Sequence, residues 1–276
     1  MIQLGKRYTL RVSELSDMGA YVDAGNLGKV LLPRRHLPAS LTVGAEISVF
    51  LYLDSDDRLI ATTRIPLAMV GEFAFLTVVD VNNAGAFLDW GLEKDLLVPY
   101  PEQHKPMKVG QSCLVYLYVD RVHGRIVASS KIDKFLDDDR PHRFRAGQAV
   151  SLTIANSTDL GYKAIINHSH WGLLHKSDVN QRLSFGQSLR GYIKHVRPDG
   201  KIDLSLQSRD DRLDKNAETI MRYLRQQDGF APLHDKSDPK LIEQTLGMSK
   251  AAFKKCIGRL YKDGLIDLSA DGIRIL

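Results

Sequence analysis

The segment Gly19-Ala20-Tyr21-Val22-Asp23 opens a pattern that the chain repeats twice in register. Its leading glycine returns at Gly85, 66 residues later, and at Gly161, a further 76 residues along. The same two steps separate four other sets of landmarks: Gly5, Gly71 and Gly147; Pro33, Pro99 and His175; Gly44, Gly110 and Gly186; and Ile60, Ile126 and Ile202. Chance would not hold five spacings constant, so the 276 residues contain three homologous units.

Each unit reads as five short strands with turns between them. In the first unit, the alternation of apolar and polar residues predicts strands at residues 8–12 and 46–53, and residues 29–33 are typical of a buried strand. Residues 19–23, after a turn, and residues 59–63 complete the set. Five strands in so short a unit indicate a small closed β-barrel. The ten additional residues of the second step fall around residues 135–141, a polar, acidic and proline-ended stretch that is typical of a linker.

In the last 66 residues, the spacing of apolar residues changes from a period of two to a period of 3.6. Residues 214–227 form an amphipathic pattern that predicts a helix, and Pro239 can start a second helix through about residue 246. Ser249 is placed to cap a third helix, and residues 264–268 with 272–276 read as a two-stranded wing. This order predicts a winged helix, a variant of the helix-turn-helix.

Three stretches resemble a known RNA-binding motif. Residues 85–88, 172–175 and 200–206 resemble the signature of the S1 motif, an OB-fold barrel that binds RNA. Three such units before a winged helix resemble the conserved virulence factor B (CvfB/YitL) family of bacterial RNA-binding proteins, and this resemblance covers essentially the whole chain. It implies an RNA-binding role for His175, whereas Pro33 and Pro99 stand where the S1 pattern has histidine.

We therefore expect a mainly β fold of three tandem S1-type OB-fold β-barrels followed by a small α+β winged-helix domain. The expected domains are residues 1–66, 67–142, 143–210 and 211–276. They carry 8 Lys/Arg against 7 Asp/Glu, 8 against 11, 10 against 5, and 12 against 10, within a net charge of +5 and a pI near 9.1. The third unit is thus the basic one, and the best candidate for binding a polyanion.

Aromatic residues on the second strand are candidates for base stacking, the usual way in which OB barrels hold single strands. Tyr21 and Phe87 hold this position in the first two units, and barrel packing is the alternative role for both. The counterpart in the third unit is Lys163, with Tyr162 beside it. Because strand side chains alternate, Tyr162 reaches the binding surface only if a bulge shifts the local register.

Other groups gather in the third unit and are candidate RNA contacts. They are Lys163, His168, His170, Trp171, His175, Lys176, Arg190, Lys194, Arg197 and Lys201, with His195 among them. Cations neutralise phosphates, while Trp171 and the histidines can stack on bases or hydrogen-bond to them. An ordinary solvated basic face is the alternative reading.

The third helix of the winged-helix domain carries cations on its outer face. Lys255, Arg259 and Lys262 lie opposite its apolar residues, and Lys250 and Lys254 flank them, as in a recognition helix or any solvated amphipathic helix. The helix start lacks the Arg, Asn or Gln expected for reading base edges. Phosphate contact is therefore the expected role.

Several other classes of site and protein are not indicated. Cys113 and Cys256 are expected to be buried reduced thiols, and the histidines around His168 lack an evident fourth ligand, so no metal, cofactor or disulfide is expected. The acidic run Asp137-Asp138-Asp139 reads as a solvated linker rather than a two-metal site, and no catalytic motif occurs, so an enzyme is not expected. Neither a signal peptide nor a membrane span is evident, which predicts a cytoplasmic protein without a membrane partner.

Three functions remain in competition. The leading one is a protein that binds single-stranded RNA through its barrels, helped by the winged helix, in post-transcriptional gene regulation. The second is a transcriptional regulator that binds DNA through the winged helix. The third is a scaffold whose barrels bind proteins. The oligomeric state stays open.

Overall fold

The structure is a computed structural model that describes residues 1–136, 142–179 and 181–276. Asp137, Asp138 and Asp139, expected to be linker, lie outside these residues. Contacts within the chain divide it into two compact units: residues 1–143, 150–190 and 196–203 form one, and residues 144–149, 191–195 and 204–276 form the other. In the part of the chain that is described, no helix has the length and apolar character to cross a membrane.

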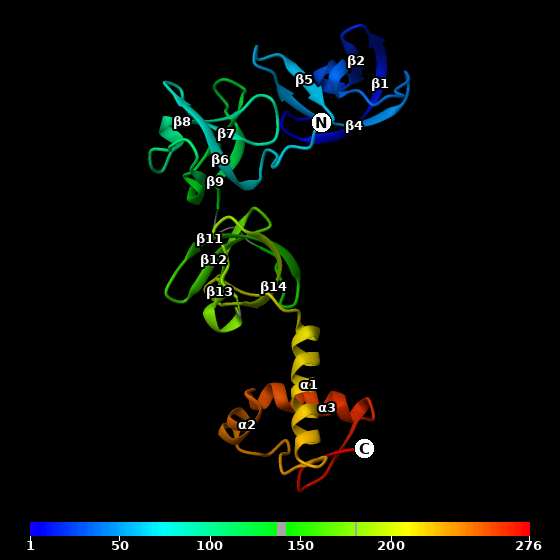
Figure 1. The fold of residues 1–276 in the computed structure, drawn as a ribbon, viewed down its shortest axis with the longest axis vertical. Coiled ribbons are helices and arrows are strands. Elements are labelled where there is room, and N and C mark those ends of the chain that lie inside the picture. The colour runs from blue at the N-terminus through cyan, green and yellow to red at the C-terminus, as the bar shows by residue number, and fades with distance from the viewer. Residues whose placement is uncertain (137–141, 180) are drawn as a thin grey trace. The chain divides into compact units, whose positions relative to one another are not determined.

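Three closed five-stranded barrels follow one another along the chain (Figure 1). The first contains β1 (Arg7–Ser16), β2 (Gly19–Asp23), β3 (Lys29–Pro33), β4 (Glu46–Leu53) and β5 (Leu59–Thr62). The second contains β6 (Phe73–Asn82), β7 (Gly85–Asp89), β8 (Leu96–Pro99), β9 (Ser112–Val119) and β10 (Ile126–Ser129). The third contains β11 (Ala149–Ser157), β12 (Gly161–Ile166), β13 (His170–His175), β14 (Ser188–Val196) and β15 (Ile202–Ser205).

The barrels share one topology, in which the third strand pairs with the fifth and the fifth with the fourth. In each barrel the first strand carries a register shift at the same place: Val12/Glu14, Val78/Asp80 and Ile154/Asn156. Such a bulge increases strand bending and twist, which a small barrel needs in order to close. The expected fold of three OB-type barrels is confirmed.

The repeated turn glycine has a steric cause. A Cβ on Gly19, Gly85 or Gly161 would lie 2.1, 2.2 or 1.9 Å from a carbonyl oxygen of the neighbouring third strand. No side chain fits there, because real Cβ atoms do not approach backbone oxygen so closely. The second strand can therefore pair tightly with the third only when it begins with glycine.

The C-terminal domain is a winged helix built from α1 (Arg209–Gln226), α2 (Pro239–Leu246), α3 (Lys250–Lys262) and a small sheet. The sheet orders β16 (Phe230–Ala231), β18 (Ile273–Ile275) and β17 (Ile266–Leu268). The predicted α2 and the Ser249 cap of α3 are confirmed, since the Ser249 side chain accepts a hydrogen bond from the Ala252 amide. The core of this domain contains Ile220, Leu224, Phe253, Cys256, Ile257 and Leu260.

Two expectations about this domain need correction. Helix α1 begins five residues before the predicted Asp214, because Ser208 and Asp211 form a reciprocal capping box that stabilises a polar first turn. The wing has a third strand, β16, which the sequence pattern did not indicate because it is only two residues long.

Both cysteines are free thiols. Cys256 is buried as expected, whereas Cys113 is only partly buried, because it packs against the edge of the barrel core near the start of β9. Burial raises the pKa of the Cys113 thiol to about 11, so this side chain is a weak nucleophile at neutral pH.

Candidate nucleic-acid interface

The outer face of the third barrel places a cation over an aromatic ring. Lys163 on β12 and Trp171 on β13 alternate with buried neighbours such as Ala164, so both side chains point away from the barrel core. The Lys163 Nζ atom lies 3.8 Å from the centre of the Trp171 ring. A pair of this kind combines an ammonium group with an aromatic surface, the two features that single-stranded nucleic acid contacts most.

His175 and Arg197 are brought together by a carboxylate. The Arg197 guanidinium donates to both oxygens of Asp203, from Nε at 2.9 Å and from Nη2 at 2.6 Å, and His175 Nε2 lies 2.9 Å from Asp203 Oδ1. The hydrogen bonds from Arg197 lower the pKa of the Asp203 carboxyl. Asp203 therefore offsets the charge of Arg197 and fixes the orientation of both partners.

A shallow pocket of about 320 Å³ lies at one end of the same barrel. Its lining residues are Ser157, Tyr162, Lys176, Val179, Gln181 and Arg182, which include two exposed cations and no carboxylate. The Tyr162 hydroxyl accepts a hydrogen bond from the Leu183 amide at 3.3 Å. Such a lining favours an anion such as a phosphate.

The position of Tyr162 follows from the register of its strand. The bulge lies in β11, whereas β12 pairs with β13 without a shift, so Tyr162 and Lys163 stay on opposite sides of β12. Tyr162 is therefore absent from the face that carries Lys163 and Trp171. It contributes to the pocket at the barrel end instead.

His168 and His170 have other neighbours. The Phe73 amide donates to His168 Nδ1 at 2.9 Å, the two rings stack with centres 6.4 Å apart, and burial lowers the pKa of His168. His170 Nδ1 lies 2.9 Å from Ser169 Oγ, and its ring packs edge-on against His142. Among the described residues, no group of three or more His, Cys, Asp or Glu is arranged to hold a metal ion.

The remaining cations of the third unit lie on β14 and in the turn after it. Arg190 and Lys194 are exposed on β14, as strand alternation predicts. Lys201 is exposed in the turn, where its Nζ lies 3.5 Å from Asp199 Oδ2.

The first two barrels present a different electrostatic setting at the equivalent face. Tyr21 and Phe87 are half-buried and point outward, as their strand positions require. Directly opposite them on the first strands stand Glu14 and Asp80, whereas Asn156 stands opposite Lys163 in the third barrel. Glu14 is paired with Lys29 at 3.1 Å, whereas Asp80 forms no ion pair with a described residue and repels phosphate. With a neutral amide at this position, the third barrel is more favourable for nucleic acid than the second.

Helix α3 exposes several of its predicted cations, and two of these form ion pairs. Arg259 pairs with Asp214 at 2.8 Å and lies 3.6 Å from Asp263, while Lys254 lies 3.9 Å from Asp235. The other members are Lys250, half-buried, and Lys255 and Lys262, both exposed. The outer face of α3 is therefore basic, although part of its charge is balanced.

Asp203 and Arg182 belong to this site but were not among the predicted residues. The alternation of buried Ile202 and Leu204 places Asp203 on the outer face and offers a signal for it in the sequence. Arg182 lies in a loop after β13, where no strand or helix period applies. Its place beside Lys176 depends on how that loop folds.

Comparisons with known proteins agree with this architecture. Residues 4–64 and 70–131 match the S1 domain family, and residues 218–275 match the CvfB-like winged helix domain. The chain is 31% identical over 280 residues to YitL of Bacillus subtilis, covering 95% of this chain and 90% of YitL. It is 28% identical over 253 residues to conserved virulence factor B of Staphylococcus aureus, covering 85% and 81% of the two chains.

A solved structure of a multidomain protein with nucleic acid binding domains from Streptococcus pneumoniae is also similar. It is 26% identical in sequence, covers 99% of this chain and 98% of its own, and superposes with a TM-score of 0.40. The S1 and winged-helix matches support a role in nucleic-acid binding. Since the match to YitL spans nearly the full length of both chains, this protein belongs to the CvfB/YitL family, with S1 domains followed by a CvfB-like winged helix.

Proposed function

We propose that the chain binds single-stranded RNA on its third barrel, with help from the winged helix, and acts in post-transcriptional gene regulation. The observation that carries this proposal is the Lys163–Trp171 pair on an outer face that lacks the carboxylate present in the other barrels. Both side chains are half-buried, and Trp171 also packs against the cluster that contains Phe73 and Ile165. A base would contact the part of this pair that stays exposed, while the ammonium contacts a phosphate. Stacking of this kind contributes roughly 1–3 kcal/mol per base.

The pocket lined by Tyr162, Lys176 and Arg182 supplies a neighbouring anion site, because Lys176 directly follows His175 at the end of β13. A strand that stacks at Trp171 would thus meet further cations along the same barrel. Arg197 and Lys201 contribute less net charge, since each lies close to an aspartate. The salt dependence of binding should therefore arise mainly from Lys163, Lys176 and Arg182.

Fluorescence anisotropy with a labelled single-stranded RNA, the matching DNA strand and a DNA duplex tests this function. A variant with Lys163→Gln, Lys176→Gln and Arg182→Gln should bind RNA more weakly. The plot of log affinity against log salt should become flatter. Its slope should decrease in magnitude by about two, because each lost phosphate contact on a single strand removes ~0.7. An unchanged slope in this folded variant would contradict the proposal.

A matched control changes the charge equally elsewhere. Lys105, Lys108 and Arg121 are exposed on the second barrel, and their replacement by Gln removes the same three charges. This control should keep the affinity and salt slope of the unmodified chain.

A second candidate function, duplex DNA binding, is favoured by one observation. The outer face of α3 carries exposed Lys254, Lys255 and Lys262. Binding of the duplex in preference to both single strands would move the function to this helix. The triple variant of the third barrel would then keep full affinity.

A further inference from the structure

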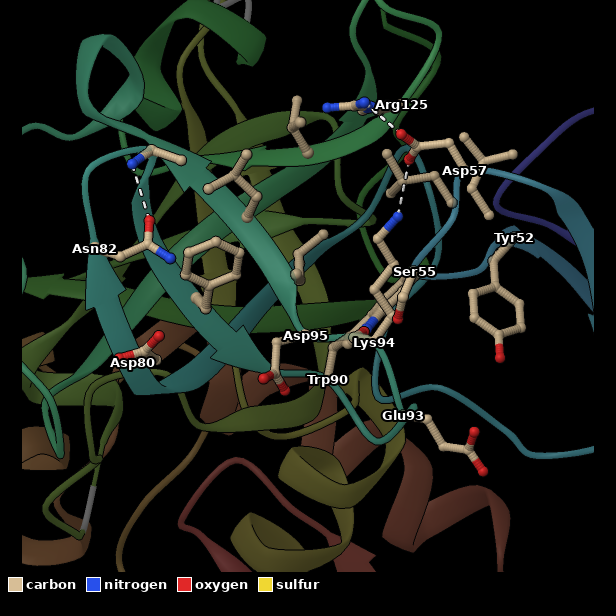
Figure 2. A pocket seen from close by; sticks show the side chains of 17 residues that line it. Tyr52, Ser55, Asp57, Asp80, Asn82, Trp90, Glu93, Lys94, Asp95 and Arg125 are labelled. Atoms are coloured by element: carbon tan, nitrogen blue, oxygen red, sulfur yellow. Dashed lines mark hydrogen bonds and ion pairs between the residues drawn. The ribbon is translucent and has the colours of Figure 1, made fainter.

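A pocket of about 560 Å³ lies on the outer face of the second barrel (Figure 2). Its apolar lining includes Phe87 on β7, Leu97 on β8 and Val127 on β10, of which Leu97 and Val127 are register partners. By the repeat, this is the face that carries Lys163 in the third barrel. The volume falls in the usual range of ligand pockets, ~300–1,000 Å³.

One wall of the pocket comes from the loop between β4 and β5 of the first barrel. Lys94 Nζ donates to the Asp54 carbonyl at 2.6 Å and to Asp57 Oδ1 at 3.0 Å, and Arg125 also pairs with Asp57. Figure 2 shows Asp57 between Lys94 and Arg125. The two cations that line the pocket are thus already engaged by the protein and offer little charge to an anionic ligand.

The other carboxylates of the lining leave the pocket negative. Glu93 is paired with Arg35 of the first barrel, whereas Asp80 and Asp95 form no ion pair with any residue that the structure describes. Asp80 stands directly opposite Phe87 in the sheet, and Asp95 immediately precedes β8. Burial first, and then the nearby Asp89 and Asp80 carboxylates, raise the pKa of Asp95, as expected where negative charges lack a counterion.

We infer that this pocket is a docking site for a basic segment of a partner protein, with an arginine or lysine side chain inserted over Phe87. The cationic head would lie against the aromatic ring between Asp80 and Asp95, and its aliphatic stem would cover Leu97 and Val127. Cation–π contact and carboxylate hydrogen bonds both favour such a head group. RNA fits this face poorly, because its phosphates would meet two uncompensated carboxylates.

Charge complementarity is the reason for choosing a basic polypeptide as the occupant. The chain as a whole carries a formal net charge of +5, so general attraction does not bring a basic peptide to it. Any such binding must arise from a local acidic surface. The residues from 67 to 142 form the acidic part of the chain, with 8 Lys/Arg against 11 Asp/Glu.

Anisotropy of a short fluorescein-labelled peptide of alternating arginine and glycine, titrated with the full-length protein at low salt, tests this inference. The unmodified chain should bind it, and Asp80→Asn with Asp95→Asn should weaken binding on the order of tenfold. Phe87→Ala should also weaken binding of the peptide. Phe87→Leu keeps an apolar side chain in the pocket and loses only the cation–π contact, so it should weaken binding less than Phe87→Ala.

Two controls separate this site from general electrostatics. Asp17→Asn with Asp133→Asn changes the net charge equally at exposed positions away from the pocket lining and should leave peptide binding unchanged. A peptide with citrulline in place of arginine keeps the shape without the charge and should not bind. Equal binding of the citrulline peptide, equal binding by the Asp80/Asp95 variant, or no binding by the unmodified chain would overturn the inference.

The RNA titration distinguishes this site from the one on the third barrel. The Asp80→Asn, Asp95→Asn variant should bind single-stranded RNA at least as tightly as the unmodified chain. A loss of RNA affinity in this variant would show that the pocket takes RNA and would overturn the inference. If the third barrel does not bind RNA, the expected peptide binding to the pocket of the second barrel is unchanged, because the two sites lie on different barrels.

Discussion

One equivalent position in each barrel differs in charge beside the candidate binding residue. Glu14, Asp80 and Asn156 occupy equivalent places, each opposite the central residue of the second strand. In the first two barrels an aromatic residue therefore faces a carboxylate, and in the third a lysine faces a neutral amide. Opposite residues in an antiparallel pair lie within contact distance, so these substitutions change which partner the same fold attracts.

Asp203 gives the third barrel a predictable response to acid. Hydrogen bonds from Arg197 lower the pKa of its carboxyl in the folded state. A lowered pKa contributes stability above the ordinary pKa of an aspartate, and this contribution is lost as the pH falls through the folded-state value. Asp203→Asn should therefore destabilise the barrel by about 1–2 kcal/mol near pH 7 and by less near pH 3.

Hydrogen exchange of the β13 and β15 amides, corrected for intrinsic rates, measures this difference at both pH values. Asp199→Asn is the matched control, because Asp199 pairs with Lys201 in an exposed turn. Exposed pairs contribute little, so this control should show a smaller effect. A destabilisation by Asp203→Asn that stays constant down to pH 3 would contradict the assignment.

The repeat and the family resemblance predicted individual side chains of the site. Lys163 was a candidate as the counterpart of Tyr21 and Phe87, and His175 through the S1 resemblance, and the structure places both, with Trp171, on the outer face of the third barrel. The pairing of Arg197 with Asp203 was not predicted, because it depends on the geometry of a β-turn. The contact of His168 with Phe73 joins residues 95 positions apart, which local periodicity does not address.

Helix α3 contains a glycine that its own fold does not require. Gly258 lies within the helix, has no positive φ, and a Cβ there would meet no atom within 4 Å. Glycine in a helix interior is less stable than alanine by roughly 0.5–1 kcal/mol. Gly258→Ala should therefore stabilise the winged-helix domain by about that amount, seen as a higher midpoint in thermal unfolding followed by circular dichroism at 222 nm.

The same chemical change at Gly247 should act in the opposite direction. Gly247 ends α2 in the left-handed conformation with φ +64°, which alanine adopts only with strain. Gly247→Ala should lower the midpoint. A stabilising effect at both positions, or at neither, would show that backbone conformation does not control these two sites.

The elements themselves followed from the sequence more closely than the site did. β2, β3 and β4 begin and end at the predicted residues, since each has one face in the barrel core. The first strand extends past the predicted Val12 to Ser16, because a bulge interrupts the alternation. The early start of α1 was not predicted, because its first turn is polar and shows no apolar repeat. This turn is stabilised by the capping box of Ser208 and Asp211 instead.

Charge is distributed unevenly over the whole molecule. Residues 1–142 carry 16 Lys/Arg against 18 Asp/Glu, a net charge of −2, and residues 143–276 carry 22 against 15, a net charge of +7. The acidic half holds the pocket around Phe87, and the basic half holds Lys163, Lys176 and the exposed face of α3. We therefore expect the two halves to have different partners.

Separate production of the two halves tests this division. Residues 143–276 should retain most of the RNA affinity and its salt dependence, while residues 1–142 should bind RNA at least tenfold more weakly, because phosphate neutralisation dominates binding to single strands. Phe73 and Ile165 share one buried cluster, so circular dichroism must first establish that each half is folded. Equal RNA binding by two folded halves would mean that stacking on Tyr21 and Phe87 outweighs the difference in net charge between the halves. In that case all three barrels would share the RNA, and local charge would not decide which barrel binds it.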